Sequence, residues 1–274
     1  MNKLFCGAKE LDISTPVVMG ILNLTPDSFF DGGKFPGIDA QLRQVEKLLT
    51  EGAAIIDVGA VSTRPGSKTV EEDEELERLI PSVIAILEKF PGCLLSVDTF
   101  RANVARHAVK HGAFMINDIY GGRFETGMIE TVASLNVPYV MMHMKGTPVN
   151  MQDNPIYSDV VAEVAYFFEN QLNKCREAGL HQVIIDPGFG FGKTVEHNFT
   201  LLARLYEFAT PENPLLVGIS RKSMVNRSLN IRASEALNGT SVLHTIALMK
   251  GARILRVHDV REAVEAVRLV GMVG

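Results

Sequence analysis

The stretch LLSVDTFRANVARHAVKHGAFMINDIY, residues 94–120, carries the pattern that decides the fold. It opens with an apolar run, Leu94 to Phe100, continues with an amphipathic segment, Ala102 to Gly112, and closes with a second apolar run, Phe114 to Tyr120. Short apolar runs of this kind are typical of buried strands, and the segment between them has the period of a helix that ends at a glycine. The stretch therefore predicts a strand, a helix and a second strand parallel to the first.

The same alternation extends along the whole chain. We expect eight strands from its apolar, β-branched runs: Val17 to Leu24, Ala54 to Ala60, Leu94 to Phe100, Phe114 to Tyr120, Tyr139 to Met144, Gln182 to Pro187, Leu215 to Ser220 and Arg253 to His258. Amphipathic segments that predict helices between them include Asp39 to Gly52, Glu72 to Phe90, Ala102 to Gly112, Asp159 to Gly179, Ser234 to Gly251 and Arg261 to Met272. Strands buried on both faces read as nearly continuous apolar runs, which is typical of a parallel sheet covered by helices.

Eight such units predict a closed (β/α)8 barrel, the TIM barrel fold, for which about 250 residues is typical. An open, doubly wound α/β sheet gives the same signals unit by unit and remains the alternative. No linker or low-complexity segment divides the 274 residues, so we expect a single domain over residues 1–274. The segment Leu4 to Ser14 precedes the first barrel strand and predicts a short hairpin that plugs the bottom of the barrel.

Composition excludes several classes of protein. The formal net charge of -5 argues against a nucleic-acid partner, because affinity for a phosphate backbone comes from clustered Lys and Arg. Three separated cysteines, Cys6, Cys93 and Cys175, form neither a disulfide framework nor a zinc motif. The first residues do not resemble a signal peptide, and no apolar run is long enough to cross a membrane. We therefore expect a cytoplasmic protein with no membrane partner.

Polar and ionisable residues gather at one end of these otherwise apolar strands. They are Asn23, Asp57, Asp98, Asn117 with Asp118, His143, Asp186, Arg221 with Lys222, and Arg256 with His258. In a barrel the active site is built at the C-terminal ends of the strands. The pattern therefore predicts a site at that end rather than scattered surface charge.

Two of these carboxylates have competing interpretations. Asp98 can accept two hydrogen bonds from an amidine-like ring edge, or it can cap the helix that begins near Ala102. Asp186 can bind a ligand donor, or it can brace the glycine-rich loop that follows it. That loop is not a phosphate-binding P-loop, because Pro187 stands where the motif requires its first glycine. Its glycines predict tight turns and close approach of a ligand.

The cations at neighbouring strand ends suit a diphosphate. Arg256 offers bidentate geometry, and Lys222, Arg221 and His258 add positive charge; ion pairing with Asp186 or Asp259 is the structural alternative. The segment 62–67 carries one guanidinium and predicts a loop that clamps an anion, with an ordinary surface loop as the alternative. We interpret His143 as structural, with Met142 and Met144 pointing inward.

Seven motifs then resemble the dihydropteroate synthase family, from Val17 to the C-terminus. They are MGILNLTPDSF at 19–29, STRPG at 62–66, VDT at 97–99, IND at 116–118, DPGFGFGK at 186–193, SRKS at 220–223 and RVHD at 256–259. The resemblance implies a pterin pocket, a diphosphate site with magnesium and a p-aminobenzoate site.

The roles that the resemblance implies fall into three groups. Pterin-binding residues would be Asp98, Asn117, Met141, Asp186, Phe191 and Lys222. The diphosphate would be held by Asn23, Arg64, Arg256 and His258, with Asn23 as the protein ligand of Mg2+. The p-aminobenzoate site, where sulfonamides would compete, would comprise Phe29, Thr63, Pro65, Lys222 and Ser223. Asp98, Lys222, Arg256 and His258 would be the catalytic residues.

The implied reaction is substitution at the exocyclic methylene of the pterin, where diphosphate leaves and the arylamine nitrogen bonds. One departure from the family is Ala60-Val61, where Gly-Glu is usual, and we expect it to alter the hydrogen bonding of the loop that follows. The alternatives are a methyltetrahydrofolate-binding corrinoid methyltransferase barrel and a non-catalytic pterin-binding protein. Family members pair through the later barrel helices, so a homodimer is expected, with Leu237 to Leu248 contributing.

Overall fold

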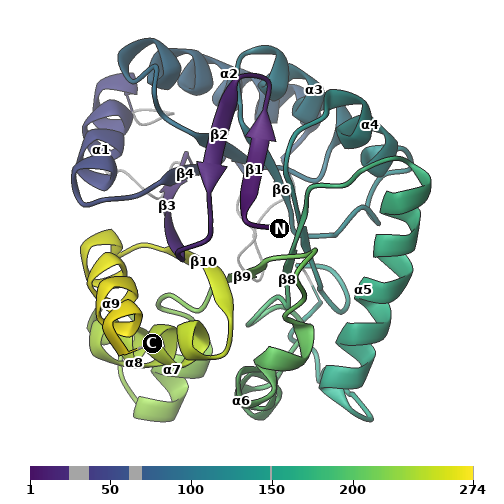
Figure 1. Ribbon diagram of the computed structural model, residues 1–274, viewed down its shortest axis with the longest axis vertical. Coiled ribbons are helices and arrows are strands. Elements are labelled where there is room, and N and C mark those ends of the chain that lie inside the picture. Colours follow the sequence, from purple (N-terminus) through teal and green to yellow (C-terminus); the bar gives the residue numbers. More distant parts are fainter. Residues whose placement is uncertain (25–36, 62–69, 149, 274) are drawn as a thin grey trace.

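The computed structural model describes residues 1–24, 37–61, 70–148 and 150–273. Eight parallel strands close into a barrel in the order β10-β3-β4-β5-β6-β7-β8-β9, and the helices surround it (Figure 1). The strands are β3 Val17–Asn23, β4 Ile55–Gly59, β5 Leu95–Asp98, β6 Met115–Asp118, β7 Tyr139–Met142, β8 Val183–Asp186, β9 Leu215–Val217 and β10 Ala252–Val257. All eight predicted runs are confirmed, and closure between β10 and β3 rules out the open sheet.

The helices are α1 Ile38–Thr50, α2 Glu72–Lys89, α3 Ala102–Lys110, α4 Met128–Leu135, α5 Val160–Glu177, α6 Val195–Ala203, α7 Ser223–Leu229, α8 Leu237–Met249 and α9 Val260–Val273. Their predicted stops are confirmed, because Gly52, Gly112, Gly179 and Gly251 all have positive φ. The helix expected from Ser234 begins later, at Leu237, after a short 3-10 turn over Ala233–Glu235. That turn is closed by the Glu235 side chain, which accepts the backbone N–H of Arg232.

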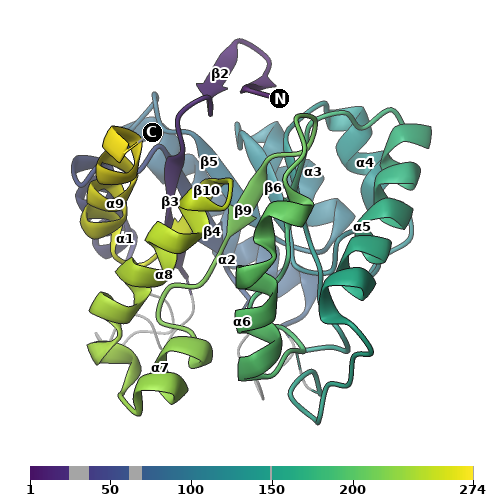
Figure 2. The same ribbon diagram turned by 60° about the horizontal axis from the view of Figure 1, so that its bottom comes forward.

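The N-terminal hairpin closes one end of the barrel. Its strands, β1 Lys3–Cys6 and β2 Lys9–Asp12, pair antiparallel and lie at the end opposite α7 (Figure 2). Leu4 is fully buried and packs in one apolar cluster with inward-facing barrel residues such as Phe114. The Gln182 side chain bonds both backbone groups of Phe5. The predicted plug is therefore confirmed, and the open mouth of the barrel is at the C-terminal ends of the strands.

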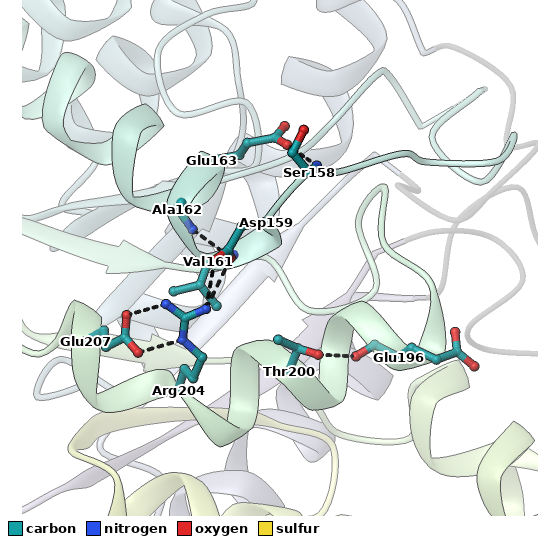
Figure 3. Close-up of polar contacts among 9 residues, drawn as sticks. All are labelled: Ser158, Asp159, Val161, Ala162, Glu163, Glu196, Thr200, Arg204 and Glu207. Atoms are coloured by element: carbon teal, nitrogen blue, oxygen red, sulfur yellow. Dashed lines mark hydrogen bonds and ion pairs between the residues drawn. The ribbon is translucent and has the colours of Figure 1, made fainter.

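Polar contacts join α5 to α6 on the outer surface (Figure 3). Asp159 accepts the backbone N–H groups of the first turn of α5, and the same carboxylate receives Arg204 from the end of α6 at 3.0 Å. Arg204 also bonds Glu207. These contacts fix the point where the long loop after β7 enters α5.

Two further sequence predictions concern location. Among the described residues, no helix is long and apolar enough to cross a membrane. The three cysteines carry free thiols, and two of them, Cys93 and Cys175, are buried. Burial raises the pKa of the Cys93 thiol to about 11, so it behaves as a core residue rather than as a nucleophile.

Candidate active site

Barrel register brings the polar strand ends together. Residues paired across parallel strands share a face, and Gly59, Asp98 and Asn117 are in register on β4, β5 and β6. Met142 and Asp186 are in register on β7 and β8. The same face is apolar further down, where Met115, Val140 and Ile184 fill the barrel interior. The inner face therefore changes from apolar to polar at its C-terminal end.

Arg256 of β10 lies between two carboxylates inside the mouth. Its Nε donates to Asp57 Oδ2 at 2.6 Å, and its Nη2 donates to Asp98 Oδ2 at 3.0 Å. The Asn117 amide donates to the same Asp57 oxygen at 3.1 Å. Asp57 is fully buried, and its other oxygen, Oδ1, has no hydrogen-bond partner among the residues that the structure describes. The guanidinium thus compensates one deeply buried charge and holds one edge of Asp98.

Asp98 lies on the inner face of the barrel mouth and does not cap the neighbouring helix. The first amide of α3, Ala102 N, donates instead to Glu125 at 2.6 Å. Burial raises the pKa of Asp98 to about 7, against the effect of the Arg256 cation, which lowers it. A carboxyl group whose pKa is raised toward neutral pH is typical of a functional site.

Asp186 and Lys222 place a second carboxylate and a second cation in the mouth, and each affects the pKa of the other. Asp186 Oδ1 accepts the backbone N–H of Gly188 at 2.7 Å, so the bracing interpretation holds for one oxygen. Its Oδ2 and Lys222 Nζ both lie near Gly218, where a Cβ would be 4.0 Å from the oxygen and 3.6 Å from the nitrogen. Burial lowers the pKa of Lys222 to about 8, although the Asp186 carboxylate raises it. One carboxylate thus both fixes a loop and faces a cation.

Arg221 and His258, the other basic residues at these strand ends, have different partners. Arg221 pairs with Asp259, so the structural alternative holds for this residue. Its φ of +57° lies in the left-handed region, which is strained for a non-glycine residue. The chain turns at this residue, immediately before Lys222 and α7. His258 stays at the mouth, with Nδ1 3.1 Å from Ser220 Oγ, and partial burial beside Arg256 lowers its pKa. Arg256 therefore carries the positive charge at this point of the mouth, and His258, whose pKa is lowered to about 4, adds a neutral imidazole.

Most residues predicted for the site lie around this mouth. Asn23 ends β3, Phe191 lies in the loop after β8 with its ring 4.6 Å from Lys222 Nζ, and Ser223 begins α7. Met141 does not match its predicted role, because it packs in the layer between barrel and helices, in register with Asp118. Strand alternation places Met142 on the inner side instead. Phe29, Thr63, Arg64 and Pro65 lie outside the described residues.

The departure at Ala60-Val61 has a visible counterpart. Val61 packs against an apolar cluster that includes Phe100 and Met142 at the rim. The carbonyl of Ala60 accepts Arg78 of α2 at 3.3 Å. An apolar contact therefore occupies the position where the family usually has a carboxylate.

Two functional neighbours were missed by sequence reasoning. Asp57 was noted as a strand end but given no role, although a charged residue inside the apolar run IIDVG requires a partner. Lys193 was noted only as the last residue of the motif at 186–193, yet it is 3% exposed and contacts His143 Nδ1 at 2.9 Å. His143 itself packs on Phe167 of α5, which agrees with its structural interpretation.

A parallel (β/α)8 barrel with paired carboxylates and cations inside its open mouth defines an α/β-barrel enzyme. The sequence profile of the pterin binding enzyme family matches residues 19–258. Dihydropteroate synthase of Escherichia coli K12 is 48% identical over 270 residues, which cover 98% of this chain and 95% of that protein. The chain belongs to the dihydropteroate synthase family.

Solved structures agree over the same length. Yersinia pestis dihydropteroate synthase in complex with a sulfonamide drug superimposes with a TM-score of 0.93 at 44% identity, covering 99% of this chain and 98% of that one. The Xanthomonas albilineans enzyme in complex with 7,8-dihydropteroate gives a TM-score of 0.88 at 38% identity, with the same coverage. These matches favour neither the corrinoid methyltransferase nor the non-catalytic alternative.

Proposed function

We propose that this chain condenses 6-hydroxymethyl-7,8-dihydropterin diphosphate with p-aminobenzoate, giving 7,8-dihydropteroate and pyrophosphate in folate biosynthesis. The observation that carries the proposal is the alternation of carboxylates and cations across one mouth: Asp98 and Asp186 beside Arg256 and Lys222. A pterin ring presents N–H donors on one edge and the diphosphate presents anionic oxygens. A site for this substrate therefore needs hydrogen-bond acceptors for the ring and cations for the diphosphate, close enough together to bind one molecule.

The pterin ring would bind deepest. Asp98 has a side chain 13% exposed and the free Asp186 oxygen faces the same space, so both can accept ring N–H groups. Asn117 and Lys222 would bind the remaining polar edge, and Phe191 would cover one face of the ring. Only ionised carboxylates accept without donating, so ring binding favours the deprotonated form of Asp98.

The diphosphate would lie at the rim, against Arg256 and His258 with Arg64 added from the second loop. Magnesium would be held there by Asn23, diphosphate oxygens and water, because Mg2+ dehydrates reluctantly and usually binds few protein oxygens. The described residues contain no cluster of three or more His, Cys, Asp or Glu suited to a metal, so the amide of Asn23 fits a substrate-dependent site. The ion would supply positive charge to the leaving group.

The p-aminobenzoate would occupy the outer part of the mouth. Ser223, exposed at the first turn of α7, and the stem of Lys222 would contact it, together with Phe29, Thr63 and Pro65. Sulfonamides would compete for the same position.

The chemistry is electrostatic. Negative charge develops on the departing diphosphate, and a fixed donor aimed at such charge typically contributes about 2.7 to 4 kcal/mol to the transition state. Arg256 and His258 are the fixed donors here. The arylamine is neutral near pH 7, so no strong general base is needed. Asp98 would stabilise a cationic pterin as the diphosphate leaves.

The test is pyrophosphate release by the purified protein given the pterin diphosphate, Mg2+ and p-aminobenzoate. We expect release that requires p-aminobenzoate and collapses in Asp98→Asn and Arg256→Ala. A matched control is Arg253→Ala, which makes the same change at the other end of β10, where Arg253 donates to the carbonyl of Ser14. No release by wild type that still binds the pterin would overturn the proposal.

We also propose a cytoplasmic homodimer. Exposed apolar side chains gather on α8 and α9, the two helices that lie side by side at the C-terminal end of the chain (Figure 1): Val242, Met249, Leu269, Met272 and Val273. Light scattering should give the dimer mass, and Met249→Glu with Leu269→Glu should give the monomer mass. A monomer at assay concentrations would contradict this part.

A further inference from the structure

The glycine loop consists of residues 187–192, which follow β8. From Gly188 to Gly192, each backbone carbonyl of this loop accepts a hydrogen bond from a side chain. The five carbonyls accept hydrogen bonds from side chains of four residues: Gly188 O and Phe191 O from Lys193, Phe189 O from Lys222, Gly190 O from Gln152 and Gly192 O from Tyr157. A loop normally directs such groups to water. This loop is instead held by specific donors, which points to a need for fixed geometry.

Lys193 is the centre of this arrangement. Its Nζ lies 3.0 Å from both Gly188 O and Phe191 O, and 3.3 Å from His143 O at the end of β7. Among the described residues, no carboxylate bonds the Lys193 amine. Its partners are backbone carbonyls and one histidine nitrogen, and the side chain is buried. A buried amine is costly unless all its hydrogens are bonded. Such a cost is retained where it fixes a conformation.

The loop also sits unusually close to the backbone beneath it. A Cβ added at Gly188 would be 1.9 Å from His143 O, so only glycine permits this approach. Lys193 Nζ donates to both the Gly188 and the His143 carbonyls, so it joins the loop to the backbone that it approaches.

The inner side of the loop carries the groups that face the pocket. Lys222 Nζ donates to Phe189 O at 2.6 Å and lies 4.6 Å from the Phe191 ring. A Cβ at Gly190 would be 3.2 Å from the Lys222 side chain. The position of the Lys222 ammonium is therefore set by the loop rather than by its own helix.

We propose that Lys193 is a positioning residue: from outside the pocket it holds the glycine loop so that Phe191 and Lys222 are fixed at the mouth. Lys193 touches no substrate. Its kinetic effect rests on the proposed function, because Lys222 is there assigned to the pterin.

The test uses Lys193→Met, which keeps the chain length and removes the donor. The readout is the pH dependence of Lys222 acetylation by acetic anhydride, followed by mass spectrometry of the Lys222 peptide. In the wild type the half-point should lie near the pKa of about 8 that burial gives Lys222 beside Asp186, Asp98 and Arg256. In the variant a loosened loop admits water and the half-point should move up toward the ordinary value of 10.5. We also expect the KM for the pterin diphosphate to rise roughly tenfold.

The matched control is Gln171→Met. Gln171 is 3% exposed and its amide donates to Gly121 O at 2.7 Å, so this variant also breaks a buried bond to a loop carbonyl, but in the loop after β6. A purely structural role for Lys193 predicts that the two variants behave alike. Equal Lys222 half-points in wild type, Lys193→Met and Gln171→Met would overturn the proposal.

If Lys193→Met does not fold, Tyr157→Phe keeps the question open to experiment. It removes only the hydroxyl that donates to Gly192 O at 2.8 Å and leaves the ring in place. Hydrogen exchange of the Gly188 and Gly190 amides should accelerate, and the Lys222 half-point should rise. Unchanged exchange and titration would reject the inference. The acetylation readout requires no synthase activity, so an inactive wild type would reject the proposed function and leave this inference standing or falling by its own measurement.

Discussion

Replacement of Arg256 by methionine should make the stability of the protein depend on pH over a wider range. In the wild type the pKa of Asp98 is about 7, above its ordinary 3.8, so the folded protein holds a proton that the unfolded chain releases. The contribution of Asp98 to the free energy of unfolding therefore falls as pH rises from about 4 to about 7 and then levels. Removing the guanidinium removes the charge that lowers this pKa, so the fall should continue above pH 7.

The magnitudes follow from the contacts. Arg256→Met leaves Asp57 and Asp98 without their cation, and breaking a buried pair costs about 3 to 5 kcal/mol. Each further pH unit above about 7 should widen the gap between variant and wild type by about 1.4 kcal/mol. Urea unfolding followed by circular dichroism at about pH 6 and about pH 8.5 measures this gap by linear extrapolation. A gap that is the same at both values would refute the assignment of the proton to Asp98; Arg253→Met serves as the control.

Three other substitutions test separate parts of the molecule. Asp98→Asn should remove one titrating proton, since an amide does not titrate, so the free energy of unfolding of the wild type minus that of the variant should fall between about pH 4 and about pH 7, and calorimetry should show weaker pterin binding; a difference that stays constant with pH would assign the proton elsewhere. Tyr139→Phe should cost about 1.5 to 3 kcal/mol in urea unfolding, because the buried Tyr139 hydroxyl donates to the Asp118 carboxylate at 2.6 Å, and a neutral result would show that Asp118 finds another donor. Leu4→Ala should lower unfolding free energy by about 2 to 5 kcal/mol while kcat stays at the wild-type value, and a large loss of kcat would mean that the plug shapes the mouth.

Periodicity was sufficient for the barrel because its strands are buried on both faces and its helices on one. The inward position of Asp98, Asn117 and Asp186 also followed from the sequence, since each ends a strand whose other residues are apolar. Met141 was assigned from the family resemblance, whereas strand alternation had placed Met142 inward, as the structure does. A strand alternates sides at every residue, so an error of one position in register exchanges an inner residue for an outer one.

The partners of the polar residues could not be predicted. Asp57 and Arg256 are 199 residues apart, and they meet only because β10 closes on β3. Lys193 reads in the sequence as the end of a glycine run, and nothing local indicates that its amine turns inward to the carbonyls. Such contacts depend on closure and loop geometry, which carry no periodic signal.

Because β10 is the last strand of the barrel in the sequence, the barrel can close only late in synthesis. β3 can pair with β10 only after residues 254–257 have been synthesised, so for most of translation one barrel edge has no partner. Arg256 lies on the same strand, so Asp57 and Asp98 have no ion pair with it until β10 is in place. A chain that stops short of β10 therefore lacks both the β10–β3 pairing and the cation that balances Asp57 and Asp98.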